Sequence, residues 1–207
     1  MGRVVFIDSR VSDIDALLDG LAPDEQAFVL NGASDGFAQI ATILKNNGLT
    51  GLASISIVGH GAPGEIEIGS SVIHDADLAN DAAALSAIGA SLASDGALAL
   101  YACDTAAGAT GSQFISDLSA YAGGVTVDAA THVIGNADPA SWTLDVSTTP
   151  AAAAVSAPFA EQALANFSTT LGIIGLTPGT SATFHGGGAA VSIAPNLIVT
   201  DSASSTL

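Results

Sequence analysis

The sequence predicts an α/β fold, a three-layer sandwich in which helices cover both faces of a mostly parallel sheet of about six strands. Short apolar runs that suit buried strands alternate along the chain with segments whose apolar residues recur at helical spacing. The segments between strands are long enough to cross back over the sheet, as parallel pairing requires. With 207 residues and a 49% hydrophobic composition, the chain can bury one sizeable core.

Apolar runs and helical spacing place the individual elements. Strands are expected, in chain order, at residues 4–7, 27–30, 54–58, 97–101 and 125–127, with an edge strand over 142–146, where polar and apolar residues alternate. Helices are expected between Ser12 and Pro23, from Asp35 to about Gly48, from Asp77 to Asp95, from Gly108 to Tyr121 and within 157–167. Residues 65–69 alternate with period two, so a small hairpin is expected over the strand ends.

The composition changes after Ser147 and divides the chain into three parts. Residues 1–147 carry the alternation of strands and helices and are expected to form the main domain. Residues 148–170 open with a stretch rich in Thr, Pro and Ala, typical of a linker, and contain the last expected helix. Residues 171–207 are rich in Gly, Thr, Ser and Val without a helical period, which predicts a short β-type tail, the start of a β-rich repeat.

The charge of the chain excludes some partners. Three Lys and Arg residues against 20 Asp and Glu give a formal net charge of −17, which argues against binding to nucleic acid or to an anionic membrane surface. Ca²⁺ and cationic partners remain open. We expect no membrane insertion, because no apolar stretch reaches the roughly 18 to 20 residues of a membrane span. The start of the chain lacks a signal peptide, so any export signal is expected outside it.

Two reactive side chains follow neighbouring predicted strands. His60 comes directly after the strand at 54–58, and Cys103, the only cysteine, comes after the strand at 97–101. Because ligands gather at the carboxyl ends of strands in open α/β sheets, the pair is expected at one edge as nucleophile and base. The alternative is structural: a buried cysteine that acts as a small hydrophobe, and a histidine that is hydrogen-bonded in a turn.

Other sites have weaker support. The G-x-G-x-x-G string at 59–64 contains Pro63 and leads into an alternating segment, so it lacks the helix that a dinucleotide phosphate site needs. No G-x-S-x-G elbow precedes a helix, which leaves a serine hydrolase without a nucleophile. His74, His132 and His185 show no metal-ligand spacing with Cys103, so no metal site is expected.

The order of these elements resembles a known peptidase fold. With His-Gly after the third strand and a cysteine after the fourth, residues 3 to 147 resemble the caspase-like (clan CD) cysteine peptidases. More closely, VVFIDSRVSDIDALLDGL, SISIVGHGAPGEIEIG and LALYACDTAAGATGSQFISDLSAYAGG are similar to an N-terminal domain of uncharacterised function, DUF4347, that opens very large bacterial surface and secreted proteins. The tail after Leu171 is similar to the start of a cadherin-like or calcium-binding repeat in such proteins.

The resemblance implies roles for individual residues. In caspase-like peptidases the histidine, here His60, protonates the leaving amine, and the oxyanion is held by backbone N–H groups, here those of Gly61 and Cys103. The pocket for the residue before the cleaved bond would draw on loops at the strand ends. These loops carry Asp8, Arg10, Asp104 and Asp128. Three acids against one arginine favour a basic residue in that pocket, unless Asp8 and Asp128 simply cap turns.

Two classes of function follow as expectations. The first is a cysteine endopeptidase of an exported or cell-surface bacterial protein, which needs no cofactor and acts on a peptide segment of its own chain or of a neighbouring surface protein. The second is a non-catalytic cap or adhesion module that shields the first repeat of such a protein. In either case the tail after Leu171 could mediate self-assembly through unpaired strand edges. A small-ligand receptor is a third class, without a dedicated polar cluster to support it.

Overall fold

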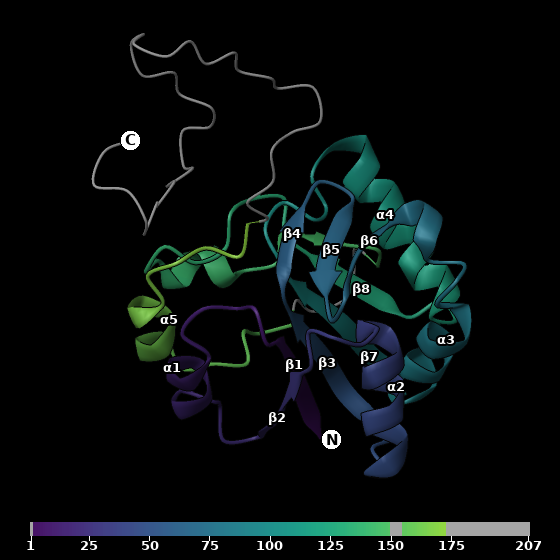
Figure 1. Cartoon of the computed structure of the whole chain (residues 1–207), viewed down its shortest axis with the longest axis horizontal. Helices are drawn as coiled ribbons and strands as arrows, with labels where there is room; N and C mark the ends of the chain where they lie inside the picture. Colours follow the sequence, from purple (N-terminus) through teal and green to yellow (C-terminus); the bar gives the residue numbers. More distant parts are fainter. Residues whose placement is uncertain (1, 150–154, 173–207) are drawn as a thin grey trace, which may run out of the picture. The chain divides into compact units, whose positions relative to one another are not determined.

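A six-stranded sheet forms the middle layer of the structure, a computed structural model that describes residues 2–149 and 155–172. The strands lie in the order β2-β1-β3-β7-β8-β9, and all neighbours are parallel except β8 and β9 (Figure 1). Their bounds are β1 Arg3–Asp8, β2 Glu25–Leu30, β3 Leu52–Val58, β7 Leu92–Tyr101, β8 Thr126–Ala129 and β9 Val146–Ser147. This confirms the predicted mostly parallel sheet.

Helices cover both faces of the sheet, as the alternation predicts. One side carries α2, α3 and α4, and the other carries α1 and α5 (Figure 1). The helices are α1 Ile14–Asp19, α2 Gly36–Asn46, α3 Ala82–Ala90, α4 Gly108–Tyr121 and α5 Glu161–Asn166, with short 3₁₀ turns η1 Asp75–Asp77 and η2 Pro139–Trp142. The arrangement is a three-layer α/β sandwich.

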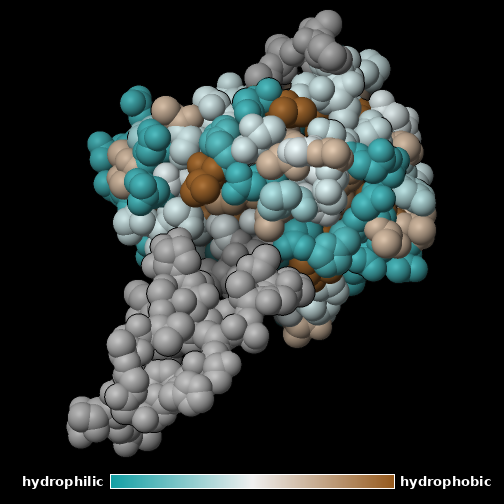
Figure 2. Space-filling view, turned by 90° about the horizontal axis from the view of Figure 1, so that it is seen from above, coloured by the Kyte–Doolittle hydropathy of each residue, from teal (hydrophilic) through white to brown (hydrophobic). Residues whose placement is uncertain are grey.

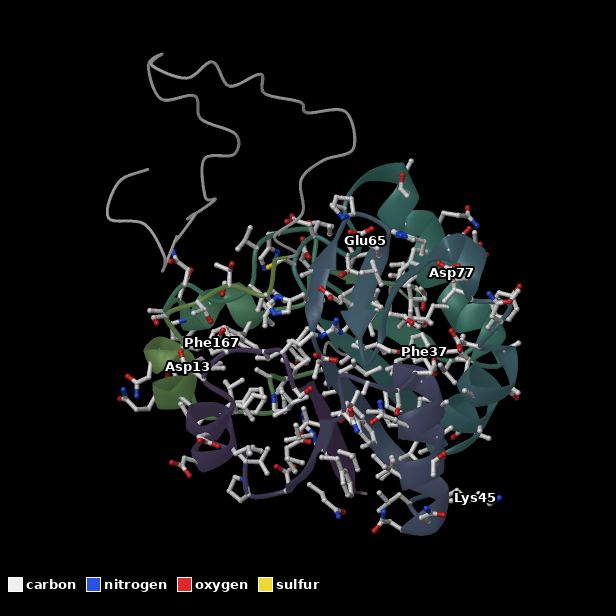
Figure 3. The ribbon with its side chains drawn as sticks, in the orientation of Figure 1. Asp13, Phe37, Lys45, Glu65, Asp77 and Phe167 are labelled. Carbon is white, nitrogen blue, oxygen red and sulfur yellow. The ribbon has the colours of Figure 1, made fainter. Side chains whose placement is uncertain are left out.

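The central strands are mostly apolar because both of their faces are buried. Val4 and Phe6 of β1 belong to the core under α2, α3 and α4, whereas Val5 and Ile7 belong to the core under α1 and α5. Adjacent side chains of a strand point to opposite faces, so a continuous apolar run fills both cores. Figure 3 shows the result, with Phe37 on the α2 side of the sheet and Phe167 on the α5 side.

A second, small sheet lies over the carboxyl ends of the parallel strands. It is antiparallel and consists of β4 His60–Ala62, β5 Glu65–Ile68 and β6 Ser71–His74. The predicted hairpin is thus present and gains a third strand. It is held to the end of β7 and the segment after it by hydrogen bonds from the Gly59 N–H, just before β4, to the Tyr101 carbonyl (3.2 Å) and from the Gly64 N–H to the Thr105 carbonyl (3.1 Å).

Two elements differ from the prediction. The helix expected from Asp77 to Asp95 is divided into η1 and the shorter α3, and β7 already begins at Leu92. The edge strand expected over 142–146 is only Val146–Ser147, because the fully buried Trp142 ends a 3₁₀ turn that Pro139 begins. There the local alternation gives way to packing of the large indole ring.

All described residues, 155–172 as well as 2–149, belong to one compact unit. The β-type tail expected over 171–207 lies outside the described residues apart from Leu171 and Gly172. Figure 2 shows a face on which hydrophobic side chains are scattered among hydrophilic ones. Among the described helices, none is both long and apolar enough to cross a membrane.

Candidate active site

The pairing of β3 with β7 brings His60 and Cys103 to one edge of the sheet. Val58 and Tyr101 are register partners at the ends of these two neighbouring strands. His60 and Cys103 each follow two residues after this pair, so the backbone places them side by side. The predicted juxtaposition rests on this register.

Cys103 is buried, and its sulfur is held by one residue of a distant loop. Its side chain is 1% exposed. The Sγ atom accepts a hydrogen bond from the Ile134 N–H (3.1 Å) and faces the Ile134 carbonyl (3.5 Å). Burial raises the pKa of the Cys103 thiol to about 11, against the smaller opposing effect of the backbone hydrogen bond from Ile134. The thiol is therefore neutral at pH 7 in this state.

His60 is half-buried and lies between two carbonyl groups. Its Nδ1 atom is 3.1 Å from the Gly172 carbonyl, and its Nε2 atom is 3.4 Å from the Arg10 carbonyl. Which ring nitrogen donates depends on the tautomer, and either N–H would face a carbonyl oxygen. The Nδ1 side of the ring thus lies next to Gly172.

The backbone N–H groups of Gly61 and Cys103 converge on a single oxygen. Both donate to the Leu171 carbonyl, at 2.8 Å from the Gly61 nitrogen and 3.4 Å from the Cys103 nitrogen. These are the two donors that the peptidase resemblance implies for the oxyanion. Gly61 fits tightly, since an added Cβ would lie 2.5 Å from Thr105 Oγ1 and 2.8 Å from the Ala102 Cβ. Glycine is needed here for the two backbones to approach.

The cleft between His60 and Cys103 is occupied by the chain itself. Residues 169–171 lie antiparallel to residues 134–136, with hydrogen bonds from the Leu171 N–H to the Ile134 carbonyl (3.0 Å) and from the Asn136 N–H to the Thr169 carbonyl (2.6 Å). Gly172 then forms a parallel bridge with Gly61. The segment 169–172 is therefore bound as an extended peptide across the carboxyl edge of the sheet.

Two of the four predicted pocket residues form an ion-pair network next to His60. Asp8 is fully buried and accepts hydrogen bonds from the Arg10 backbone N–H (2.9 Å), the Arg10 guanidinium (2.8 Å) and the Gly69 N–H. Arg10 also pairs with Glu67. The hydrogen bond to Asp8 is the main cause that raises the pKa of Arg10. Asp8 thus caps its turn and fixes the loop whose Arg10 carbonyl faces the histidine ring.

The other two predicted pocket residues lie apart from that network. Asp104 takes a left-handed conformation with φ of 56° and donates its N–H to the His132 carbonyl (3.0 Å), which turns the chain sharply after Cys103. Asp128 lies inside β8 and is buried, and it accepts a hydrogen bond from the Val155 N–H (3.4 Å). Neither carboxylate has a described contact with residues 169–172.

His74 and His132, two of the histidines without metal-ligand spacing, pair with carboxylates. His74 Nδ1 lies 2.9 Å from Glu65, and His132 Nδ1 lies 3.5 Å from Asp145. His185 lies outside the described residues. Within 2–149 and 155–172, no group of three or more His, Cys, Asp and Glu side chains is placed to hold a metal ion.

Sequence reasoning missed the residues that fill the cleft and those that hold them there. Leu171 and Gly172 carried no chemical signal, and Ile134 contributes only its backbone to the strand pairing. The one available signal was Gly135, whose φ is 110° and where an added Cβ would lie 2.2 Å from the Thr169 carbonyl oxygen. A glycine of this kind marks a close approach of two backbones, but only the structure identifies the second one.

The raised thiol pKa makes a testable prediction for the chain with its cleft occupied. In the His60→Ala variant, which keeps the thiol, iodoacetamide should label Cys103 more than about 100-fold more slowly than free cysteine at pH 7. Because the thiol ionises only as the pH approaches about 11, labelling should accelerate about tenfold per pH unit above neutrality. Mass spectrometry of the alkylated protein measures the rate. Fast labelling at pH 7 would contradict the buried, neutral thiol.

Comparison with known proteins and protein families assigns the chain to a family. No curated protein matches it. A family model described as a domain of unknown function, DUF4347, matches residues 4–171, which include the whole sheet, His60, Cys103 and the segment up to Leu171. The chain therefore belongs to the DUF4347 family.

Proposed function

We propose that this domain is a cysteine peptidase that cleaves an extended peptide segment, with Cys103 as the nucleophile and His60 as the acid and base. The observation that carries the proposal is that the Gly61 and Cys103 N–H groups both donate to one peptide carbonyl, the Leu171 oxygen. Two preorganised donors of this kind stabilise the negative charge that forms on a carbonyl oxygen during attack.

The other parts of the site support the same chemistry. His60 lies beside the peptide unit that follows that carbonyl, where the leaving amine of a cleaved bond needs a proton. The peptide is held by antiparallel backbone pairing, which fixes its direction and does not depend on its side chains. The reaction needs no metal or other cofactor, because attack, charge stabilisation and proton transfer are all assigned to residues of the chain.

Hydrolysis of a foreign protein tests this proposal. Fluorescein-labelled casein is incubated with the 207-residue chain and with its Leu171→Asp variant, in which a charged side chain at a fully buried position is expected to release the segment and open the cleft. We expect fluorescent peptides to appear with Leu171→Asp, whereas the uncut wild-type chain, whose site is occupied by its own segment, should release few. In the Leu171→Asp background Cys103→Ala should abolish the release, and His60→Ala should slow it about 10²- to 10⁴-fold.

His74→Ala serves as the matched histidine control, since His74 lies on the same small sheet but is exposed and pairs with Glu65, away from residues 169–172. It should leave the rate unchanged. Circular dichroism spectra show whether each variant is folded. If folded Leu171→Asp does not hydrolyse casein, or hydrolyses it equally with and without the thiol, the peptidase proposal is wrong and a non-catalytic cap or adhesion module becomes the better explanation.

A further inference from the structure

We infer that the bond this site cleaves is the chain's own Leu171–Gly172 peptide bond, and that the pocket before the bond selects a leucine-like side chain. The inference rests on the proposed peptidase function and adds to it the substrate and the specificity. Cleavage here separates residues 1–171, which carry the complete site, from everything that follows.

The first support is the position of this one bond among the reactive groups. Its carbonyl oxygen accepts both oxyanion hydrogen bonds, as described above. Cys103 Sγ lies close to Gly172, since a Cβ built on Gly172 would be 4.0 Å from the sulfur. His60 contacts the Gly172 carbonyl at 3.1 Å, on the side of the leaving amine. The thiol, the two N–H donors and the imidazole thus all lie around residues 171 and 172.

The second support is the way in which the segment is held. The pairing of residues 169–171 with residues 134–136 continues upstream, where the Ala137 N–H donates to the Phe167 carbonyl (2.7 Å). Gly135 makes this approach possible, because a side chain there would collide with the Thr169 carbonyl. The loop after β8 is therefore shaped to hold this segment in the extended form that a peptidase requires.

The third support concerns specificity. The Leu171 side chain is fully buried and belongs to the apolar core that includes Ile134, Trp142 and Phe167. Asp8 is the fully buried acid among the predicted pocket residues, and both of its carboxylate oxygens already accept hydrogen bonds from Arg10 or Gly69. It is therefore not available to pair with a basic side chain at position 171. A leucine-sized apolar residue fills the pocket, and a cationic one would lose its hydration without a partner.

The reaction balances with one water molecule. The Cys103 sulfur attacks the Leu171 carbonyl carbon while its proton passes to His60, and the oxygen becomes an anion held by the Gly61 and Cys103 N–H groups. As the C–N bond breaks, His60 gives the proton to the Gly172 nitrogen, which leaves as a new amino terminus. Water then attacks the Leu171 thioester, giving a Leu171 carboxylate and regenerating the thiol.

Cell-free synthesis of the 207-residue chain tests the assignment, because it defines the starting time. We expect the full-length band to be converted into two fragments, and mass spectrometry should show one that ends at Leu171 and one that begins at Gly172. Cys103→Ala should remain whole. Conversion of the wild-type chain at a different bond, or no conversion at all, would overturn the assignment.

Substitutions of Leu171 test the pocket. Leu171→Met keeps size and polarity and should be cut within about fivefold of the wild-type rate. Leu171→Arg should be cut at least about 100-fold more slowly, because its charge cannot be solvated there. Val133→Arg is the matched control, since it adds the same charge at a neighbouring position where the side chain is 50% exposed, and its rate should be unchanged. Cutting of Leu171→Arg at the wild-type rate would overturn the leucine specificity.

The two proposals can fail separately. If folded Leu171→Asp degrades casein in a Cys103-dependent way while the wild-type chain stays whole, the domain is a peptidase and segment 169–172 is a bound inhibitor, so the inference is wrong and the proposed function stands. If neither casein nor the chain is cut, both are wrong.

Discussion

Replacing Gly61 with alanine is expected to slow cleavage about 10²- to 10³-fold, the effect of removing one oxyanion donor. The added Cβ would lie 2.5 Å from Thr105 Oγ1, 2.8 Å from the Ala102 Cβ and 2.9 Å from the Cys103 carbonyl oxygen. At least one of these groups, or the Gly61 backbone, must move. All three neighbours belong to the segment that carries the nucleophile, so the shift separates the two N–H groups that converge on one oxygen.

The rate is measured by the appearance of the fragment that begins at Gly172 after cell-free synthesis. Gly32→Ala is the control, because its added Cβ meets only the flexible Ser9 Oγ atom, at 3.2 Å, and its cleavage rate should be unchanged. Circular dichroism separates a damaged site from an unfolded chain. A folded Gly61→Ala variant that cleaves at the wild-type rate would show that the Gly61 N–H plays no part in the reaction.

Trp142→Ala is expected to lower the free energy of unfolding by about 3–5 kcal/mol, the usual cost of removing a large aromatic side chain from a core. Trp142 is 1% exposed, and its ring centroid lies 5.4 Å from that of Phe167 and 5.7 Å from that of Phe159, both edge-to-face, and 5.9 Å from that of Tyr101. For a domain of this size the melting temperature should fall on the order of 10 °C.

Urea unfolding in a Cys103→Ala background measures this change on an uncut chain. Trp142→Phe is the control, because it keeps an aromatic ring and removes an indole N–H that has no hydrogen-bond partner among the described residues. It should cost less than about 1.5 kcal/mol. Since Phe167 packs on the indole and precedes the bound segment, Trp142→Ala should also slow cleavage in the chain that retains Cys103. Equal stability of the alanine and phenylalanine variants would contradict the importance of this packing.

The sheet could be predicted from the sequence because its strands are buried on both faces. Continuous apolar runs such as 97–101 have no other low-energy location in a domain of this size, and the helices between them enforce parallel pairing. The prediction was wrong where tertiary packing dominates the local pattern. Trp142 alternates with polar neighbours like a strand residue, yet it lies at the end of a 3₁₀ turn because the core under α5 accommodates its ring.

Only part of the candidate site could be predicted from the sequence. His60, Gly61 and Cys103 could be predicted, since they follow neighbouring strands and their residue types have a chemical meaning. The bound segment could not, because main-chain hydrogen bonds between residues 134–136 and 169–171 connect parts of the chain far apart in sequence and depend on no particular side chain. Such pairing leaves almost no trace in composition or periodicity.

The tethered strand in the cleft also determines how the uncut protein treats its surroundings. Any other polypeptide must compete with an occupant that is attached to the same molecule and present at an effective concentration on the order of millimolar. The uncut chain should therefore cleave other proteins very slowly when their concentration is well below millimolar. Its own conversion should follow first-order kinetics with a half-time that dilution does not change.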